Sequence, residues 1–389
     1  MNTGRTVFAQ LMDLIPQHQF RRFVDRYNGN RRTRSFSCWN QFLCMAFAQL
    51  TYRESLRDIE ACLRALPQKL YHSGLRGTIS RSTLADANEK RDCRIYADLA
   101  QWLMKEAREL YARDPFVLNL DRSVYAFDST TIELCLSLFP WAAFHQWTAG
   151  VKLHTLLDLR GNIPRFACIT HSRVHDSTVM PSLPIEPGAI YVFDRGYLDF
   201  SRLHAVHEQK ATFVIRAKRG ILFRRIASRT VDKTTGLRCD QTVQCAGKRG
   251  LRDYPDTLRR VRFYDAENKR TFIFLTNNFM LPALAIAQIY RSRWRIELFF
   301  RWIKQHLRIH RFYGTSPNAV KTQIWTALCV YLLVAIARKR LGIERDLFTI
   351  LQVLSVSLFE KTLLREALSE MPAQIETSSD ANQLSLLDL

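Results

Sequence analysis

The fold of this 389-residue chain is decided by one stretch, Tyr290-Arg-Ser-Arg-Trp-Arg-Ile-Glu-Leu-Phe-Phe-Arg-Trp-Ile-Lys304. An α-helix turns by about 100° per residue, so residues 3, 7 and 14 positions apart return to nearly the same side. Tyr290, Arg293, Glu297 and Lys304 therefore share one helical face, which Arg301 extends with further positive charge. An adjacent apolar stripe is predicted to face the core and consists of Ile289, Ile296, Phe300, Ile303 and Leu307.

Two further carboxylates follow apolar segments of strand character. Val124-Tyr-Ala-Phe127 leads into Asp128, and Ala189-Ile-Tyr-Val-Phe193 leads into Asp194. We expect each Asp to end its strand, where the edge of a sheet can fix the side chain. Together with Glu297 they offer three hard oxygen ligands, the kind that Mg²⁺ or Mn²⁺ prefers. Two such ions can activate the attacking oxygen and stabilise the leaving oxygen of a phosphoryl transfer.

Each of these features has a plain structural alternative. A lone Asp after a strand is often a turn residue, and a charged helix face is often only a solvated surface. Asp158 also ends a predicted strand, but the following Arg160-Gly161 marks it as a hairpin residue. Asp176 lies in a polar loop, where Asp176 or Ser177 could cap the next helix. His171 and His175 are four residues apart, a spacing found among zinc ligands, but no third ligand follows them.

The charge balance predicts a polyanionic partner. The chain carries a net charge of +21 with a pI near 9.9, and 47% of its residues are hydrophobic. Such an excess favours nucleic acid over a membrane surface. The nine cysteines are scattered singly without a zinc spacing, which predicts reduced, mostly buried thiols and a cytoplasmic location. The most apolar run, 325–337, is too short to span a bilayer and predicts a buried helix.

The hydrophobic periodicity predicts an α/β chain of several parts. In the N-terminal region, Ser80 or Ser82 can cap a helix after the turn at Gly74 and Gly77, a pattern compatible with a helix-turn-helix-like reader. Arginines 21, 22, 26, 31, 32 and 34 could grip phosphates there, or form a solvated surface. The predicted parts are a helical DNA-binding region (1–115), the first half of a mixed-sheet core (116–218), a basic β-rich insertion (219–270), the second half of the core with the Glu297 helix (271–315), a C-terminal helical region (316–371) and a polar tail (372–389).

These residues together carry a resemblance. The chain resembles bacterial insertion-sequence transposases of the DDE type, from the fourth insertion-sequence family, which is marked by a Tyr-x2-Arg-x3-Glu-x6-Lys (YREK) signature. Tyr290, Arg293, Glu297 and Lys304 match that signature at every position. The contexts Ala126-Phe-Asp-Ser129, His175-Asp-Ser177 and Val192-Phe-Asp-Arg-Gly196 are also similar to those of the family.

The resemblance implies a ribonuclease H-like catalytic core that is interrupted by a β-rich insertion and flanked by helical regions. It implies that Asp128, Asp194 and Glu297 hold the metal ions, Mg²⁺ with Mn²⁺ as a substitute. It further implies that Tyr290, Arg293 and Lys304, with Arg301 beside them, contact phosphates of the transposon end. Trp294 stands where the family has an aromatic that stacks on a flipped base.

We therefore expect a DNA transposase that binds the terminal inverted repeats of its insertion sequence and catalyses two-metal-ion DNA cleavage and strand transfer. It should act on double-stranded DNA as a homodimer or higher assembly, because two ends must be paired. A non-catalytic DNA-binding protein and a ribonuclease H-like nuclease or resolvase are the competing interpretations. Separately, Gln383-Leu-Ser-Leu-Leu387 resembles peptides that dock on bacterial sliding clamps.

Overall fold

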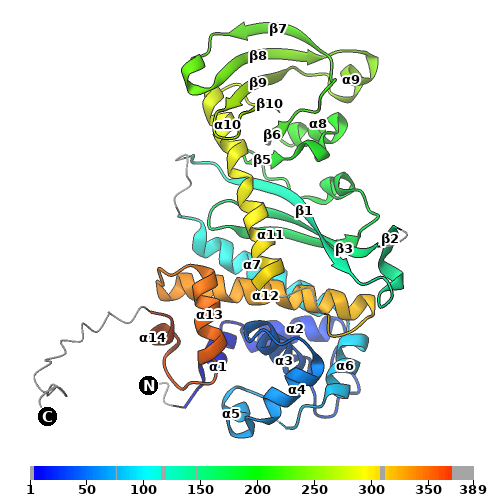
Figure 1. Ribbon diagram of the computed structural model, residues 1–389, viewed down its shortest axis with the longest axis vertical. Helices are drawn as coiled ribbons and strands as arrows, with labels where there is room; N and C mark the ends of the chain where they lie inside the picture. Colours follow the sequence, from blue (N-terminus) through cyan, green and yellow to red (C-terminus); the bar gives the residue numbers. More distant parts are fainter. Residues whose placement is uncertain (1–3, 76, 115–119, 146–147, 307–311, 370–389) are drawn as a thin grey trace, which may run out of the picture.

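The computed structural model describes residues 4–75, 77–114, 120–145, 148–306 and 312–369. Figure 1 shows an elongated molecule with a helical body at one end, a sheet in the middle and further strands at the far end. The predicted clamp segment, Gln383–Leu387, and the polar tail lie outside the described residues.

The helical body is built from both ends of the chain. Backbone hydrogen bonds join Val7 N to Glu360 O and Phe8 N to Leu358 O, each at 2.9 Å. One continuous apolar core runs through helices from both ends. The described helices of this body are α1 (Val7–Met12), α2 (Gln17–Arg26), α3 (Cys38–Leu50), α4 (Leu56–Arg64), α5 (Pro67–His72), α6 (Arg81–Lys90), α7 (Arg94–Tyr111), α12 (Pro317–Leu341), α13 (Leu347–Ser357) and α14 (Leu364–Leu368).

Local capping explains where several of these helices begin. The Ser80 side chain accepts a hydrogen bond from Thr83 N at 3.2 Å, so Ser80 rather than Ser82 caps α6. Ser37, Ser55 and Ser316 cap α3, α4 and α12 in the same way. At the far end of α12, Gly342 takes a left-handed conformation (φ +66°), which ends the helix.

Helix α12 is longer than the apolar run that predicted it. By length and composition alone it could cross a membrane, but 94% of its most apolar window is buried inside the protein. Its side chains pack against α3 and α7 in the centre of the helical body. The prediction of a buried helix is confirmed, because the apolar surface is covered by protein.

The central sheet has the strand arrangement of a ribonuclease H-like core. β1 (Val124–Leu134), β3 (Thr148–Asp158) and β4 (Ile163–His171) form an antiparallel meander, and β2 (Ala143–His145) lies at the edge of β3. β5 (Ile190–Phe193) and β6 (Thr212–Arg216) then pair in parallel on the other side of β1. The spatial order β4-β3-β1-β5-β6 confirms the predicted α/β fold class.

The sheet continues into the basic segment instead of stopping there. β10 (Arg270–Thr276) pairs with β6, and β9 (Leu258–Asp265), β8 (Leu237–Cys245) and β7 (Phe223–Arg229) follow outward in antiparallel order. The short helix α9 (Lys248–Asp253) lies between β8 and β9. The chain then returns to the core through α10 (Ala283–Ser292) and α11 (Trp294–His306), which form a column running toward the helical body (Figure 1).

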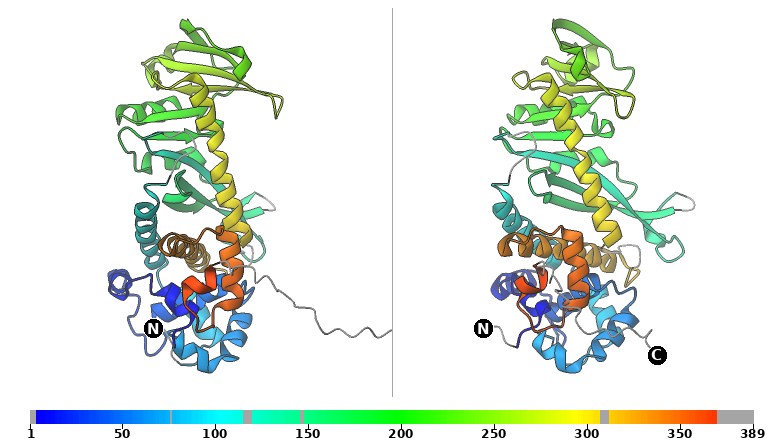
Figure 2. Two further views of the ribbon diagram at one scale, coloured as in Figure 1. Left: turned by 90° about the vertical axis from the view of Figure 1, so that its left-hand side faces the viewer. Right: turned by 60° about the vertical axis from the view of Figure 1, so that its left-hand side comes forward.

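The two faces of the sheet are covered by different helices. Alternate strand residues such as Ala126 and Val192 share a core with Ile286 and Ile296 of α10 and α11. The intervening residues belong to a second core together with α8 (Phe200–Glu208). Figure 2 shows α8 and the α10–α11 column on opposite sides of the strands. The segments between these elements include 3₁₀ helices at Pro140–Ala142, Asp176–Ser182, Arg195–Tyr197 and Lys233–Thr235.

Candidate active site

The register of the parallel strands brings the two aspartates together. β1 and β5 pair Phe127 with Phe193, so the next residues, Asp128 and Asp194, lie at the same level on neighbouring strands. Because side chains alternate between the faces of a strand, both carboxylates follow Ala126 and Val192 onto the face that α10 and α11 cover.

The strand-end expectation for Asp128 is wrong. Asp128 lies in the middle of β1, which continues to Leu134, whereas β5 ends at Phe193. The apolar run stops at Phe127 because the strand loses its β5 neighbour there, although it remains paired with β3. Asp194 does follow the end of its strand, as expected.

The third carboxylate reaches the site from the helical column. The helix is divided at Arg293, whose backbone stays helical (φ −54°, ψ −30°), so the predicted face continues from α10 into α11. Tight i→i+3 bonds mark this junction, with Arg293 N donating to Tyr290 O and Ile296 N to Arg293 O. Four residues of the predicted apolar stripe are buried below it, and the fifth, Leu307, lies outside the described residues.

Arg293 and Tyr290 tie the three carboxylates into one cluster. The Arg293 guanidinium donates from Nη1 to Asp128 Oδ2 at 2.9 Å and from Nη2 to Glu297 Oε1 at 2.5 Å. The Tyr290 hydroxyl donates to Asp194 Oδ1 at 2.9 Å. Sequence positions up to 169 residues apart, from 128 to 297, therefore meet in one place.

The electrostatics of the two aspartates differ. Burial raises the pKa of Asp128 to about 6, and the charges of Asp194 and Glu297 add to the shift against the opposing Ser129 amide and Arg293. Burial acts in the same direction on Asp194. There, however, backbone hydrogen bonds and the contacts with Tyr290 and Arg293 outweigh it and hold the pKa below its usual value. The cluster thus contains more buried negative charge than its single guanidinium compensates.

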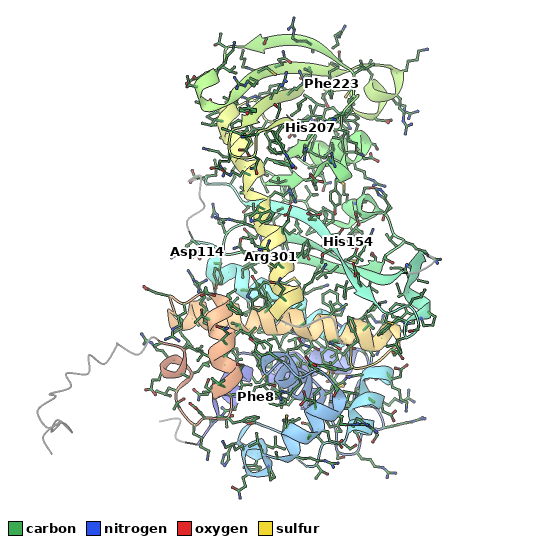
Figure 3. The ribbon with its side chains drawn as sticks, in the orientation of Figure 1. Phe8, Asp114, His154, His207, Phe223 and Arg301 are labelled. Carbon is green, nitrogen blue, oxygen red and sulfur yellow. The ribbon has the colours of Figure 1, made fainter. Side chains whose placement is uncertain are left out.

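The other predicted contact residues lie along α11. Lys304 is partly buried, and burial lowers its pKa while the negative charge of Glu133 on β1 opposes the change. Trp294 is exposed over about half of its surface (49%), and the Arg301 guanidinium lies 5.7 Å from the centre of its ring. Figure 3 labels Arg301 on the α11 column. Trp294 and Arg301 do not share the Tyr290–Arg293 cluster but form an exposed pair next to it.

The sequence analysis missed one basic residue, Arg216, which lies beside Asp194 on the neighbouring strand β6. Arg216 ends β6, where Ile215 pairs with Phe193, so Arg216 lies at the level of Asp194. Alternation from buried Val214 places it on the α10–α11 face. Its guanidinium lies 4.9 Å from the Phe272 ring, which packs on Tyr290. The signal that marked both aspartates, a polar residue after an apolar strand, could have found it.

The remaining candidates take part in other contacts. Asp158, the last residue of β3, accepts a hydrogen bond from Arg160 N and pairs with Arg108. His175, and neither Asp176 nor Ser177, caps the next 3₁₀ helix, because its Nδ1 accepts from Ser177 N. Asp176 instead pairs with Lys152 at 3.0 Å. His171 Nε2 lies 3.1 Å from Trp141 O, and its Nδ1 accepts a hydrogen bond from Arg173 N.

The predicted state of the cysteines needs one correction. Among the described residues all nine are free thiols, but four are buried, four are partly buried and Cys135 is exposed. The single spacing correctly indicated unpaired thiols, while "mostly buried" overstated their enclosure.

The donor set fits a divalent metal ion. Three carboxylates from β1, the end of β5 and α11 offer hard oxygen atoms, and their negative charge exceeds that of the one bridging arginine. Burial is the main cause of the raised pKa of Asp128, and the negative charges of Asp194 and Glu297 add to it. Asp128, Asp194 and Glu297 would hold the ion.

A family model described as "Transposase DDE domain" matches residues 119–333, more than half of the chain. The chain belongs to the DDE transposase family. The match includes the strands, the basic segment and the α10–α11 column, so it covers all three carboxylates of the cluster. Residues 3–76 match a second family, which is described only as a domain of unknown function.

Three relatives carry transposase names. A transposase named y4zB from Sinorhizobium fredii is 35% identical over 283 residues, 72% of this chain and 77% of that protein. A transposase for insertion sequence element IS5377 from Geobacillus stearothermophilus is 33% identical, covering 56% of this chain and 57% of its own length. A transposase for IS4SA from Synechocystis is 26% identical, covering 72% and 77%.

A piggyBac transposase, solved in a synaptic complex with hairpin DNA, aligns with a TM-score of 0.47 at 9% identity. The alignment covers 94% of this chain and 82% of that one. The family and the relatives confirm a bacterial insertion-sequence DDE transposase, an enzyme that cleaves and transfers DNA. Assignment to the YREK group remains a prediction from the residues.

Proposed function

We propose that this transposase binds the terminal inverted repeats of its own insertion sequence and catalyses two-metal-ion DNA cleavage and strand transfer. Mg²⁺ is the proposed ion, with Mn²⁺ able to replace it, and Asp128, Asp194 and Glu297 are the proposed ligands. One observation carries the proposal: three carboxylates distant in sequence converge on one partly buried cluster beside basic side chains.

When bound, divalent ions would polarise the phosphodiester and the attacking oxygen. The chain's own residues would orient the reactants. Tyr290 holds Asp194 in place through its hydroxyl, and Arg293 holds Asp128 and Glu297. Because that guanidinium occupies the space between two proposed ligands, metal binding requires Arg293 to release at least one of them. The released donors then become available to a phosphate oxygen.

Lys304 and Arg301 are proposed to hold further phosphates of the transposon end, since both follow Glu297 on α11 and carry positive charge. Trp294 is proposed to stack on an unpaired base, which its exposed ring permits. We also propose that the YREK signature is functional here as a set, because its Tyr, Arg and Glu already contact the site.

The helical body offers a second proposed DNA contact. An open groove of about 740 Å³ lies between the segment after α2 and helix α6. Its basic lining residues are Arg31, Arg32, Arg34, Lys90 and Arg91, with Asp86 and Asp92 as the acidic members. The first turn of α6 exposes Arg81, Ser82 and Thr83, and the last two line this groove. A duplex end bound here would be gripped mainly through its phosphates.

The remaining proposals concern organisation. We propose a homodimer or larger paired-end complex, action in the bacterial cytoplasm and the domain boundaries given above. Clamp docking through Gln383–Leu387 also stays a proposal. Fluorescence anisotropy with a peptide covering 378–389 and purified sliding clamp tests it, and an absence of saturable binding would remove it.

The decisive experiment is a cleavage and strand-transfer assay on DNA that carries the flanking inverted repeats, with Mg²⁺. Glu297→Gln should keep end binding and lose nicking and joining by about 10³-fold, equivalent to about 4 kcal/mol of lost transition-state stabilisation. Arg270→Gln, on the exposed end of β10, serves as the control outside the site. DNA binding without chemistry in the wild type would favour the non-catalytic reading, and cutting without joining would favour a nuclease or resolvase.

A further inference from the structure

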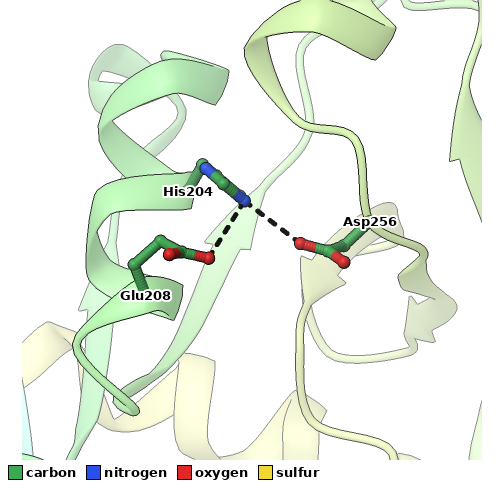
Figure 4. A group of neighbouring side chains, drawn as sticks. All are labelled: His204, Glu208 and Asp256. Carbon is green, nitrogen blue, oxygen red and sulfur yellow. Dashed lines mark hydrogen bonds and ion pairs between the residues drawn. The ribbon is translucent and has the colours of Figure 1, made fainter.

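A second cluster of metal-binding side chains lies on the other face of the sheet. His204 and Glu208 are one turn apart on α8, and Asp256 comes from the connection between α9 and β9 (Figure 4). His204 Nε2 lies 3.1 Å from Asp256 Oδ2 and 3.4 Å from Glu208 Oε1. One ligand atom from each of the three side chains falls within 4.8 Å of the others.

These spacings match the coordination shell of a small ion. Zinc binds imidazole nitrogen at about 2.0–2.1 Å and carboxylate oxygen at about 2.0–2.2 Å, usually in a tetrahedron. Two ligand atoms of such a tetrahedron are separated by roughly 3.3–3.5 Å, from simple geometry. The two separations measured from His204 lie close to that value, so small side-chain movements would suffice to enclose an ion.

The surroundings of the cluster resemble the supporting shell of a metal site. The Tyr254 hydroxyl and His207 Nδ1 lie 2.9 Å apart, and the same nitrogen is 3.6 Å from Asp256 Oδ2. The His207 and Tyr254 rings are stacked, with an interplanar angle of 13°. Tyr254 is buried, so this pair fixes the chain just before Asp256. Figure 3 shows His207 on the side of α8 that faces the outer strands.

We propose that His204, Glu208 and Asp256 form a binding site for a divalent transition-metal ion of the zinc class. An imidazole among the ligands selects Zn²⁺-like ions over Mg²⁺, which prefers oxygen atoms alone. The three residues leave a position open for water or for His207. The site is distinct from the carboxylate cluster, which lies beneath α10 and α11 on the opposite face.

The ion would join two parts of the molecule. Leu203 and Val206 anchor α8 to the core strands, while Asp256 lies two residues before the start of the outer strand β9. A bond from each side to one ion would therefore clip the outer strands to the core. Binding to the folded state alone would raise the melting temperature of the protein.

The test uses the full chain, stripped with EDTA and returned to excess Mg²⁺ so that the all-oxygen site is saturated. Zn²⁺ is then titrated by calorimetry, and Co²⁺ is titrated in parallel while its visible absorption is recorded. His204→Gln and Asp256→Asn are the test variants, and His18→Gln, an exposed histidine on α2, is the matched control. Circular dichroism verifies that each variant is folded; Asp256 is exposed, so Asp256→Asn remains informative if His204→Gln misfolds.

We expect one equivalent of Zn²⁺ to bind the wild type and the control, with a tetrahedral Co²⁺ spectrum and a raised melting temperature. Both test variants should bind at least about 100-fold more weakly, since even supporting residues of metal sites contribute about 10- to 100-fold. No Zn²⁺ binding in the wild type under excess Mg²⁺, or equal binding in all four proteins, would overturn the proposal. His204 would then serve only as an ion-pair partner of the two carboxylates.

Discussion

Two arginine–carboxylate arrangements in this protein use the same chemical groups in opposite ways. In the outer strands, Arg259 makes two parallel 2.8 Å bonds to Asp240, and its remaining guanidinium nitrogen donates to the carbonyls of Asn278 and Leu281. In the central sheet, Arg293 divides its two terminal nitrogens between Asp128 and Glu297. Its Nε atom is buried without a hydrogen-bond partner among the described residues.

The two arrangements differ in burial and in how completely the arginine is paired, which distinguishes a structural ion pair from a candidate active site. Arg259 and Asp240 are each about 5% exposed or less, and they fasten β8 and β9 to the segment that enters α10. The Arg293 cluster is more accessible, and its one guanidinium is shared by two carboxylates while the third is held by Tyr290. Unsatisfied buried groups are costly, so their presence at the cluster indicates function rather than stability.

The largest expected effect is on stability, from Asp240→Asn. The substitution leaves the buried Arg259 charge without its counter-charge, which typically costs about 3–5 kcal/mol. We expect the free energy of unfolding, measured by urea denaturation, to fall by that amount. A change below about 1 kcal/mol would contradict the structural role assigned to this pair.

The next prediction concerns how folding stability depends on pH through His154, which lies on β3 beside the strand of Asp128. His154 on β3 is fully buried, and its Nε2 lies 2.8 Å from Thr170 Oγ1, while its Nδ1 has no partner among the described residues (Figure 3). Burial lowers its pKa to about 4. The unfolded chain, with an ordinary pKa near 6.5, therefore binds a proton before the folded protein does.

The contribution of neutral His154 to the free energy of unfolding is therefore fully present above about pH 6.5. It decreases as the pH falls toward 4, and the total loss is about 3 kcal/mol. His154→Gln should flatten this part of the profile of unfolding free energy against pH. His18→Gln, at an exposed position, should leave the profile as in the wild type. Parallel profiles for wild type and His154→Gln would show that the imidazole does not titrate as described.

Much of the fold was predictable because its signals are local. Continuous apolar runs located the strands that lead to Asp128 and Asp194, and helical periodicity located the α10–α11 column. The packing of both chain ends into one helical body was not predictable. It depends on contacts such as Val7 with Glu360, between residues that no local pattern connects.

The site was predictable to the extent that its residues share a helix face or end a strand. The arrangement Tyr290, Arg293 and Glu297 follows from helix geometry alone. The neighbouring residue Arg216 and the mid-strand position of Asp128 depend on which strands pair and where each one stops. That information is tertiary, so reading one segment at a time misses it.

A smaller effect is expected at the exposed Trp294–Arg301 pair. Trp294→Ala removes a stacking surface and should weaken binding of a transposon end with an unpaired base by about 1–3 kcal/mol. Folding stability should change little, because the ring is half exposed. Leu298→Ala, an exposed apolar residue on the same helix, is the matched control. Fluorescence anisotropy with labelled end DNA measures both variants, and equal weakening by both would indicate loss of general helix surface instead of base stacking.

The smallest expected stability effect comes from the site itself. Glu297→Gln makes the same carboxyl-to-amide change as Asp240→Asn, also beside an arginine. The Glu297 side chain is 36% exposed, however, and exposed ion pairs contribute only about 0–1 kcal/mol. Removing its negative charge also relieves repulsion with Asp128, which offsets part of the lost contact. In metal-free buffer we expect urea denaturation to show a change below about 1 kcal/mol, although catalysis is lost. A loss as large as that of Asp240→Asn would mean that Arg293 and its carboxylates hold the fold together, and the contrast between the two arrangements would fail.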